Sequence, residues 1–122
     1  GKLLGVIPKT HLPNYKEFYD ARYFAPAANA VSQAILLAGQ TAPFGTDLLF
    51  PCTSPEYRGF TLGVEICEDL WMPIPPSSRQ AMAGATVQAN LSASNAVIGK
   101  AAYRRELVAG QSGRCVSGYV YA

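Results

Sequence analysis

Residues 61–66, Thr-Leu-Gly-Val-Glu-Ile, are the stretch that most constrains the fold of this chain. The run is apolar and β-branched, which is typical of a strand buried inside a sheet. It delivers Cys67 into a turn that begins with Glu68 and Asp69 and ends at Trp71. A cysteine where a rigid strand meets a turn is well placed to act as a nucleophile, but free cysteine is also among the most buried residue types. From this stretch alone, a reactive thiol and an inert thiol are both open.

The bulk composition excludes several classes of protein. A chain of 122 residues is at most one domain, and its net charge of +2 comes from scattered lysines and arginines. That distribution predicts no nucleic-acid partner and no anionic membrane partner. No apolar run approaches the roughly 20 residues of a membrane span, and the first residues lack the basic-then-apolar pattern of a signal peptide.

The cysteines indicate a reducing compartment. Cys52, Cys67 and Cys115 are odd in number and have no C-x-x-C spacing. This predicts neither a disulfide framework nor a structural zinc site. Free thiols favour a cytoplasmic location. We expect no metal and no cofactor to be held by these residues.

Both ends of the chain are unusual for a complete domain. The sequence begins directly in an apolar run at residues 2–7 and stops in residues 118–122, which look like a strand in progress. We therefore expect residues 1–122 to be a fragment of a single domain within a longer parent protein.

The first part of the chain predicts a strand and a short helix. Residues 2–7 form a strand candidate that Pro8 ends, because proline cannot donate to a sheet ladder. Lys9 then stands at the mouth of the strand as a candidate fixed cation. The spacing of Asn14 and Glu17 matches a capping box and predicts a helix that ends near Tyr23.

The rest of the chain alternates strands with helices, which predicts α/β layers rather than a helical bundle. Residues 31–37 favour a strand, although a helix over 29–38 is nearly as plausible, and residues 46–50 could pair with 60–66 as a hairpin. Ser77 is the expected cap of a helix over residues 78–83. Strands are predicted over 46–50, 61–66, 85–91 and 117–121, and helices over 78–83 and 98–112.

The surroundings of Cys67 limit its chemistry. The nucleophile is the thiolate, and like-charge repulsion from Glu65, Glu68 and Asp69 would disfavour that form. A working nucleophile here needs a nearby cation. Lys9 is the best placed, and it could also stabilise an oxyanion during acyl transfer.

A base that would activate the thiol is harder to assign. Glu17, Glu65 and Glu68 are all candidates, and none stands out. Helix capping alone would explain Glu17. His11, the one histidine, lies in a polar loop and nothing marks it as a base.

Four segments together resemble a known family. Residues 8–24, which run from Pro8-Lys9 to Arg22-Tyr23-Phe24, resemble the lysine motif of the nitrilase superfamily. Residues 63–71 resemble its cysteine motif. Residues 43–50 and 90–100 narrow the resemblance to the glutaminase domains of glutamine-dependent NAD+ synthetases. The resemblance covers nearly the whole chain, and it implies an α/β fold that is part of a nitrilase-like α-β-β-α sandwich.

This resemblance implies a Glu-Lys-Cys triad, with Lys9 as its lysine and Cys67 as its nucleophile. The general-base glutamate of the family lies well upstream of the lysine, so here it would precede residue 1. Glu68 would bind the ammonium group of glutamine, and Lys100 would bind its α-carboxylate without the bidentate fork of an arginine. The residues expected to hold glutamine are Tyr15, Glu17, Glu68, Trp71, Ser94 and Lys100.

The implied reaction begins with attack of the cysteine on the glutamine side-chain amide. Ammonia leaves, and water hydrolyses the thioester. The ammonia travels through a tunnel to a synthetase domain of the same polypeptide, where ATP and Mg²⁺ serve the amidation of deamido-NAD+. No Ser-Gly-Gly-x-Asp-Ser nucleotide loop occurs in this chain, so ATP binding is expected elsewhere in the parent protein. Family members assemble, which implies a homo-oligomer.

Two alternatives remain open. The parent protein could be a stand-alone nitrilase-type amidase that acts on another amide, in which case Glu68 and Lys100 would be dispensable for glutamine use. The 122-residue chain could also be an inactive unit that only folds or interacts. Because the upstream glutamate is not in this sequence, we expect the chain alone to have little or no glutaminase activity.

Overall fold

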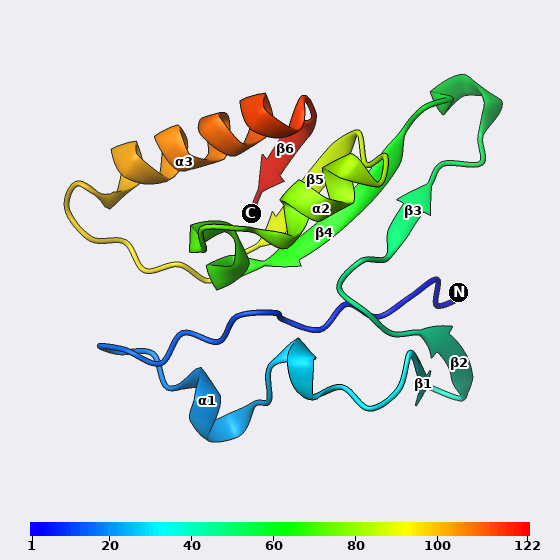
Figure 1. The fold of residues 1–122 in the computed structure, drawn as a ribbon, viewed down its shortest axis with the longest axis horizontal. Coiled ribbons are helices and arrows are strands. Elements are labelled where there is room, and N and C mark those ends of the chain that lie inside the picture. The colour runs from blue at the N-terminus through cyan, green and yellow to red at the C-terminus, as the bar shows by residue number, and fades with distance from the viewer.

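A computed structural model describes all 122 residues and contains two sheets (Figure 1). The N-terminal third, blue to cyan in Figure 1, runs along one side of a larger sheet that is built from the rest of the chain. The smaller sheet is the hairpin of β1 (Ala34–Leu37) and β2 (Gln40–Pro43). The mixed α/β fold class predicted from the sequence is confirmed.

The larger sheet has the strand order β3-β4-β5-β6. β4 pairs with β5 and β5 with β6 in parallel, whereas β3 pairs with β4 in antiparallel register, as the expected hairpin requires. Helices make the two parallel crossovers, because parallel strands cannot be joined by a tight turn. The elements are β3 (Leu49–Pro51), β4 (Thr61–Ile66), α2 (Pro76–Met82), β5 (Val87–Leu91), α3 (Lys100–Cys115) and β6 (Gly118–Tyr121).

This topology places the ends of β4 and β5 next to each other. Ile66, the last residue of β4, pairs with Leu91, the last residue of β5. Cys67 therefore leaves the sheet beside the loop that follows Leu91. Ligands of open α/β sheets bind at this carboxyl edge of the strands.

A polar network fills the space between the sheet and its helices. Glu65 and Gln88 point from β4 and β5 into this layer and are fully buried. The Ser77 N–H donates to Glu65 Oε2 at 2.8 Å, and the Tyr119 hydroxyl also donates to Glu65. Gln111 Nε2 of α3 donates to Ser77 Oγ at 2.9 Å. The hydrogen bonds of Glu65, Ser77, Gln111 and Tyr119 thus connect the helices to the sheet.

The network leaves no room for a side chain at Gly63. A Cβ atom there would lie 2.5 Å from both Gln80 Oε1 and Gln88 Oε1. The glycine in the middle of β4 is therefore required by close packing. Glycine in a strand often marks such an approach.

The N-terminal segments differ most from the sequence-based expectation. Residues 2–7 are not a strand but make a single parallel bridge, between Val6 and Phe44. The helix expected over 14–23 shrinks to α1 (Asp20–Tyr23), and the capping box is wrong, because Lys16 has a left-handed φ of 53° that a helix cannot contain.

Three further differences are local. The β1–β2 hairpin turns through Ala38 and Gly39, both with positive φ, and was not predicted. Helix α2 begins one residue after Pro75, so Ser77 is a buried helical residue and not the cap. Helix α3 continues to Cys115, where Val116 ends it in the left-handed region. The remaining short helices are 3-10 turns at Ala27–Asn29, Pro55–Tyr57 and Cys67–Trp71.

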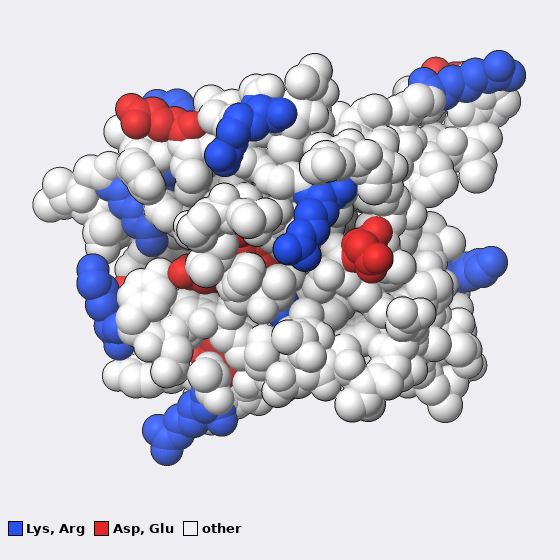
Figure 2. Space-filling model, in the orientation of Figure 1, with Lys and Arg blue, Asp and Glu red and all other residues white.

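The surface carries mixed charge. Figure 2 shows acidic and basic side chains scattered over the visible face rather than gathered into one patch. None of the helices combines the length and the apolar character that crossing a membrane demands.

Candidate functional site

Cys67 sits on a strained elbow at the end of β4. Its φ is 50°, in the left-handed region that non-glycine residues seldom adopt. Asn90 is fully buried on the neighbouring strand, and its side chain bonds to both the N–H and the C=O group of Cys67. The Cys67 N–H donates to Asn90 Oδ1 at 3.2 Å, and Asn90 Nδ2 donates to the Cys67 carbonyl at 3.3 Å. Such strain persists only where the surroundings over-determine it, and it often marks a functional residue.

Asp69 connects this elbow to the lysine segment, which is residues 8–24. Its carboxylate is 1% exposed and accepts three backbone hydrogen bonds. Asp69 Oδ1 accepts the His11 N–H at 2.7 Å. Asp69 Oδ2 accepts the N–H of Thr10 at 3.3 Å and that of Ile66 at 3.0 Å. The residues just after Lys9 and just before Cys67 are thus bound to one side chain.

Lys9 and Cys67 line one small cavity of about 240 Å³. Lys9 Nζ lies 2.6 Å from Asp20 Oδ2, and both side chains are largely buried. Phe18 and Leu91 form apolar walls of the same cavity. The structure therefore places Lys9, the predicted cation, in one cavity with Cys67, and pairs it with a carboxylate that was not predicted.

A second cavity, of about 300 Å³, also opens onto Cys67. Phe18 lies between the two cavities and lines both of them. Every residue predicted to hold the substrate lines this second cavity, together with Asn95, which was not predicted. These predicted residues are Tyr15, Glu17, Glu68, Trp71, Ser94 and Lys100.

The acidic side of the second cavity is formed by Glu68 and Tyr15. The Tyr15 hydroxyl donates to Glu68 Oε1 at 3.0 Å and lies 3.2 Å from Oε2. Partial burial raises the pKa of the Tyr15 phenol, and the hydrogen bond and negative charge of Glu68 raise it further. The phenol therefore stays protonated and keeps the Glu68 carboxylate turned toward the cavity.

The basic side is formed by Lys100. Its Nζ lies 5.1 Å from the centroid of the Trp71 ring, which is within cation–π range. The ammonium group also donates to Asn95 Oδ1, and Asn95 Nδ2 in turn donates to Glu17. The cavity thus combines an anion-binding group, a cation-binding group and a thiol in its lining.

The other candidate bases lie away from the sulfur. Glu65 lines neither cavity, because its carboxylate is buried under the sheet by Ser77 and Tyr119. The His11 side chain faces a different cavity. Of the candidate bases, only Glu17 and Glu68 line a cavity together with Cys67.

Cys115 belongs to the polar network and not to the site. Gln111 Nε2 donates to its Sγ at 3.3 Å. Burial raises the pKa of the Cys115 thiol, the Arg114 charge opposes this, and Glu65 adds to the rise. This thiol is accordingly a weak nucleophile near neutral pH.

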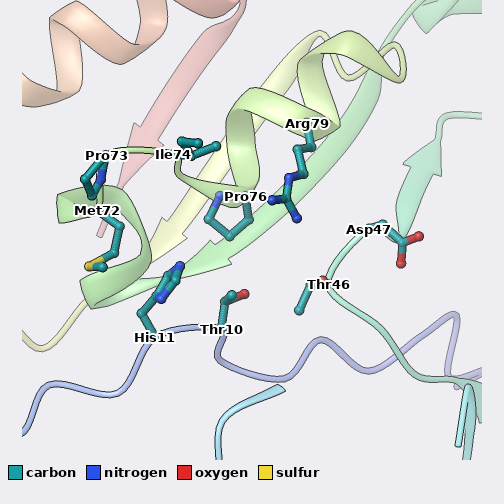
Figure 3. Close-up of a pocket in the computed structure, with 9 residues that line it drawn as sticks. All are labelled: Thr10, His11, Thr46, Asp47, Met72, Pro73, Ile74, Pro76 and Arg79. Carbon is teal, nitrogen blue, oxygen red and sulfur yellow. The ribbon is translucent and has the colours of Figure 1, made fainter. Parts of the chain in front are cut away.

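A third cavity, of about 540 Å³, contains none of the predicted site residues. Figure 3 shows the His11 ring and the Arg79 side chain reaching toward it from the lysine segment and from α2. Its walls are Thr10, His11, Thr46, Asp47, Met72, Pro73, Ile74, Pro76 and Arg79.

Several important contacts were missed from the sequence. Asp20, Asn90, Asn95 and Arg104 were not singled out. Arg104 is half-buried and donates to the Asn95 carbonyl at 2.9 Å. A polar residue in an otherwise apolar strand was the available signal for Asn90, since a buried polar group needs a partner.

Comparisons with known proteins give a consistent result. No family model matches the chain. The glutamine-dependent NAD(+) synthetase of Mycobacterium bovis is 50% identical over 122 residues, which is 100% of this chain and 18% of the relative. The enzyme of the same name from Thermotoga maritima is 35% identical over 107 residues, or 87% of this chain and 15% of the relative.

Solved structures agree with these relatives. A glutamine-dependent NAD(+) synthetase from Cytophaga hutchinsonii superposes with a TM-score of 0.76 and 32% identity, covering 98% of this chain and 18% of that one. The Acinetobacter baumannii enzyme in complex with ADP gives a TM-score of 0.65 at 26% identity, covering 93% and 17%. This chain therefore spans less than a fifth of the length of each of these proteins.

Proposed function

The chain is homologous over its whole length to a segment of the glutamine-dependent NAD(+) synthetases, and we propose that this segment hydrolyses glutamine to supply ammonia for NAD+ synthesis. The observation that carries the proposal is the second cavity. Its lining includes Glu68, Lys100 and Cys67. A free amino acid needs this pairing, because it carries an ammonium and a carboxylate at once.

We assign roles to the cavity as follows. Glu68 accepts the ammonium group of glutamine, and Lys100 binds its α-carboxylate while resting on Trp71. Tyr15 orients Glu68 through its hydroxyl. The side chain of glutamine then extends toward the sulfur, which brings its amide carbon within reach of attack.

The covalent step is thiolate attack on that amide. The general base takes the thiol proton, the sulfur forms a bond to the carbon, the carbon–nitrogen bond breaks, and the nitrogen leaves as ammonia with the proton that the base returns. Water then hydrolyses the γ-glutamyl thioester to glutamate and free thiol. Lys9, held by Asp20, stabilises the oxyanion. By family resemblance, a glutamate outside residues 1–122 is the general base.

In the full-length protein the ammonia would serve a synthetase domain that uses ATP and Mg²⁺ to amidate deamido-NAD+. Within this chain no group of three or more His, Cys, Asp and Glu side chains is arranged to hold a metal ion. We further propose that the full-length protein is cytoplasmic and forms a homo-oligomer.

A single substitution tests the proposal. In the full-length protein, Cys67→Ala should abolish NAD+ formation from glutamine and leave NAD+ formation from added ammonia unchanged. Cys52→Ala, a half-buried thiol outside both cavities, is the matched control. Equal loss of both activities in Cys67→Ala would show that the cysteine is structural and would refute the proposed role.

A further inference from the structure

We propose that Asp69 is a positioning residue for glutamine hydrolysis, because it holds Lys9 and Cys67 at a fixed separation. The inference rests on the proposed function and names a residue that takes no part in the chemistry itself. Asp69 lines neither of the cavities that contain Cys67. Its carboxylate acts only through the backbone on either side of the two reacting groups.

The hydrogen bonds of Asp69 connect two parts of the chain that share few other hydrogen bonds. The lysine segment is attached by backbone hydrogen bonds within the N-terminal part, such as Ala27 N–H to the Lys9 carbonyl at 2.9 Å. No backbone–backbone hydrogen bond links residues 1–45 to the four-stranded sheet or its helices. The bonds that cross are those of Asp69 and two contacts between exposed side chains, Tyr15 with Glu68 and Glu17 with Asn95.

Asp69 accepts hydrogen bonds from the N–H groups of Thr10, His11 and Ile66, and we call these three bonds the Asp69 clasp. Of the links between the two parts, this clasp is the strongest. Hydrogen bonds from backbone N–H groups to a carboxylate are charge-assisted and are stronger than neutral ones. The Asp69 carboxylate is 1% exposed, so water does not compete for its oxygens. Exposed side-chain pairs contribute much less because solvent screens them. Among the hydrogen bonds between the two parts, those of Asp69 therefore contribute most to the relative position of lysine and sulfur.

Only a carboxylate can make all three hydrogen bonds. Both oxygens accept, and both are used, Oδ1 by His11 and Oδ2 by Thr10 and Ile66. An asparagine of the same shape has one acceptor oxygen, and its NH₂ group would face N–H donors in place of the other oxygen. Asp69→Asn therefore opens the clasp with no change in volume.

The clasp also corrects the sequence-based view of this carboxylate. Asp69 was expected to repel a thiolate at Cys67. Its negative charge is instead directed at three N–H dipoles behind the elbow. Its contribution to the site is the geometry of the oxyanion-stabilising lysine relative to the nucleophile.

The experiment compares Asp69→Asn with Glu65→Gln in the full-length protein. Each variant neutralises a buried carboxylate at the base of the elbow, but Glu65 touches neither Lys9 nor its segment. We expect Asp69→Asn to lower kcat for glutamine hydrolysis about 100-fold, the cost typical of a small misplacement of reacting groups. The KM for glutamine should change less than kcat, since Glu68 and Lys100 lie outside the segment that Asp69 holds. Ammonia-dependent NAD+ formation should be retained.

Glu65→Gln should lower thermal stability about as much as Asp69→Asn does. It should leave kcat for glutamine within a few-fold of wild type. An unchanged kcat in Asp69→Asn, or the same loss of kcat in both variants, would overturn the proposal. If Cys67→Ala fails to abolish glutamine use, the proposed function fails, and the clasp is then judged by hydrogen exchange alone.

A measurement on the wild-type protein applies even if Asp69→Asn does not fold. The amide hydrogens of Thr10 and His11 should exchange as slowly as that of Ile66 in β4, because they share one buried acceptor. Exchange of the His11 amide at the rate of an exposed loop would overturn the proposal.

Discussion

Lys9 Nζ and Asp20 Oδ2 lie 2.6 Å apart and form the one ion pair of the structure. The two residues are eleven positions apart, with Asp20 opening the short helix α1. Both line the cavity that contains Cys67. The lysine is therefore held from one side by a carboxylate, which leaves its remaining protons free to face the sulfur and a bound substrate.

Replacement of Asp20 tests this relationship. We expect Asp20→Asn to lower kcat for glutamine hydrolysis about 10- to 100-fold in the full-length protein, because the ammonium group loses its fixed position. Steady-state kinetics with glutamine and with ammonia would separate this effect from unfolding. Asp47→Asn is the control, since Asp47 is exposed and forms no ion pair. An Asp20→Asn enzyme with wild-type kcat would contradict the assignment.

Substrate recognition is tested at Glu68. Glu68→Gln should raise the KM for glutamine about 10- to 100-fold, the cost of one charge-assisted hydrogen bond to the substrate ammonium. Ammonia-dependent synthesis should not change. Glu106→Gln on the exposed side of α3 provides a control carboxylate outside the cavity. If glutamine use survives both Glu68→Gln and Lys100→Met, the site serves a different amide.

The elbow at Cys67 is tested through Asn90. Asn90→Leu keeps the volume but leaves the N–H and C=O of Cys67 without partners, which should cost about 2–4 kcal/mol of unfolding free energy. Trp71, the only tryptophan of the chain, reports the unfolding of this region by fluorescence in urea. Asn29→Leu, at an exposed position, should change the unfolding free energy little. Equal stability of the two variants would show that Asn90 does not support the elbow.

Alkaline stability depends on Tyr119. Burial raises the pKa of its phenol above the usual value of about 10, and the charge of Glu65 raises it further. Above pH 10 the unfolded chain loses this proton while the folded chain keeps it, so the unfolding free energy falls as pH rises. Below pH 10 this contribution is fully present.

Tyr119→Phe should flatten this decline between pH 9.5 and pH 11, a window on either side of about 10, whereas Tyr57→Phe at an exposed position should leave it in place. Urea unfolding at each pH gives the two slopes. The same decline in wild type and Tyr119→Phe would rule out this tyrosine as its source.

The sequence was most informative where structure is local. The run before Cys67 is a strand because it is continuous, apolar and β-branched, and its turn follows from the polar residues after it. The α/β order of the second half is equally local, since each strand is followed by turn residues and a helix. The resemblance to a family then brought the site residues together before any contact was known.

What the sequence could not give depends on contacts between distant residues. Residues 2–7 have strand-like composition, but a strand also needs a neighbour, and here only Val6 finds one. The turn at Lys16 replaces a helix in the loop that carries Tyr15 to Glu68. The polar layer under the sheet was not expected, because residues such as Gln88 and Gln111 are usually exposed.

The left-handed backbone conformation at position 67 means that stability and the proposed activity favour different residues there. A side chain with a Cβ atom in this conformation costs about 1–2 kcal/mol, and glycine alone escapes this cost. Serine and alanine would keep the strain and lose the thiol, while glycine would relax the elbow and also lose it. Glycine at position 67 would therefore be expected to relax the backbone while removing the thiol on which the proposed reaction depends.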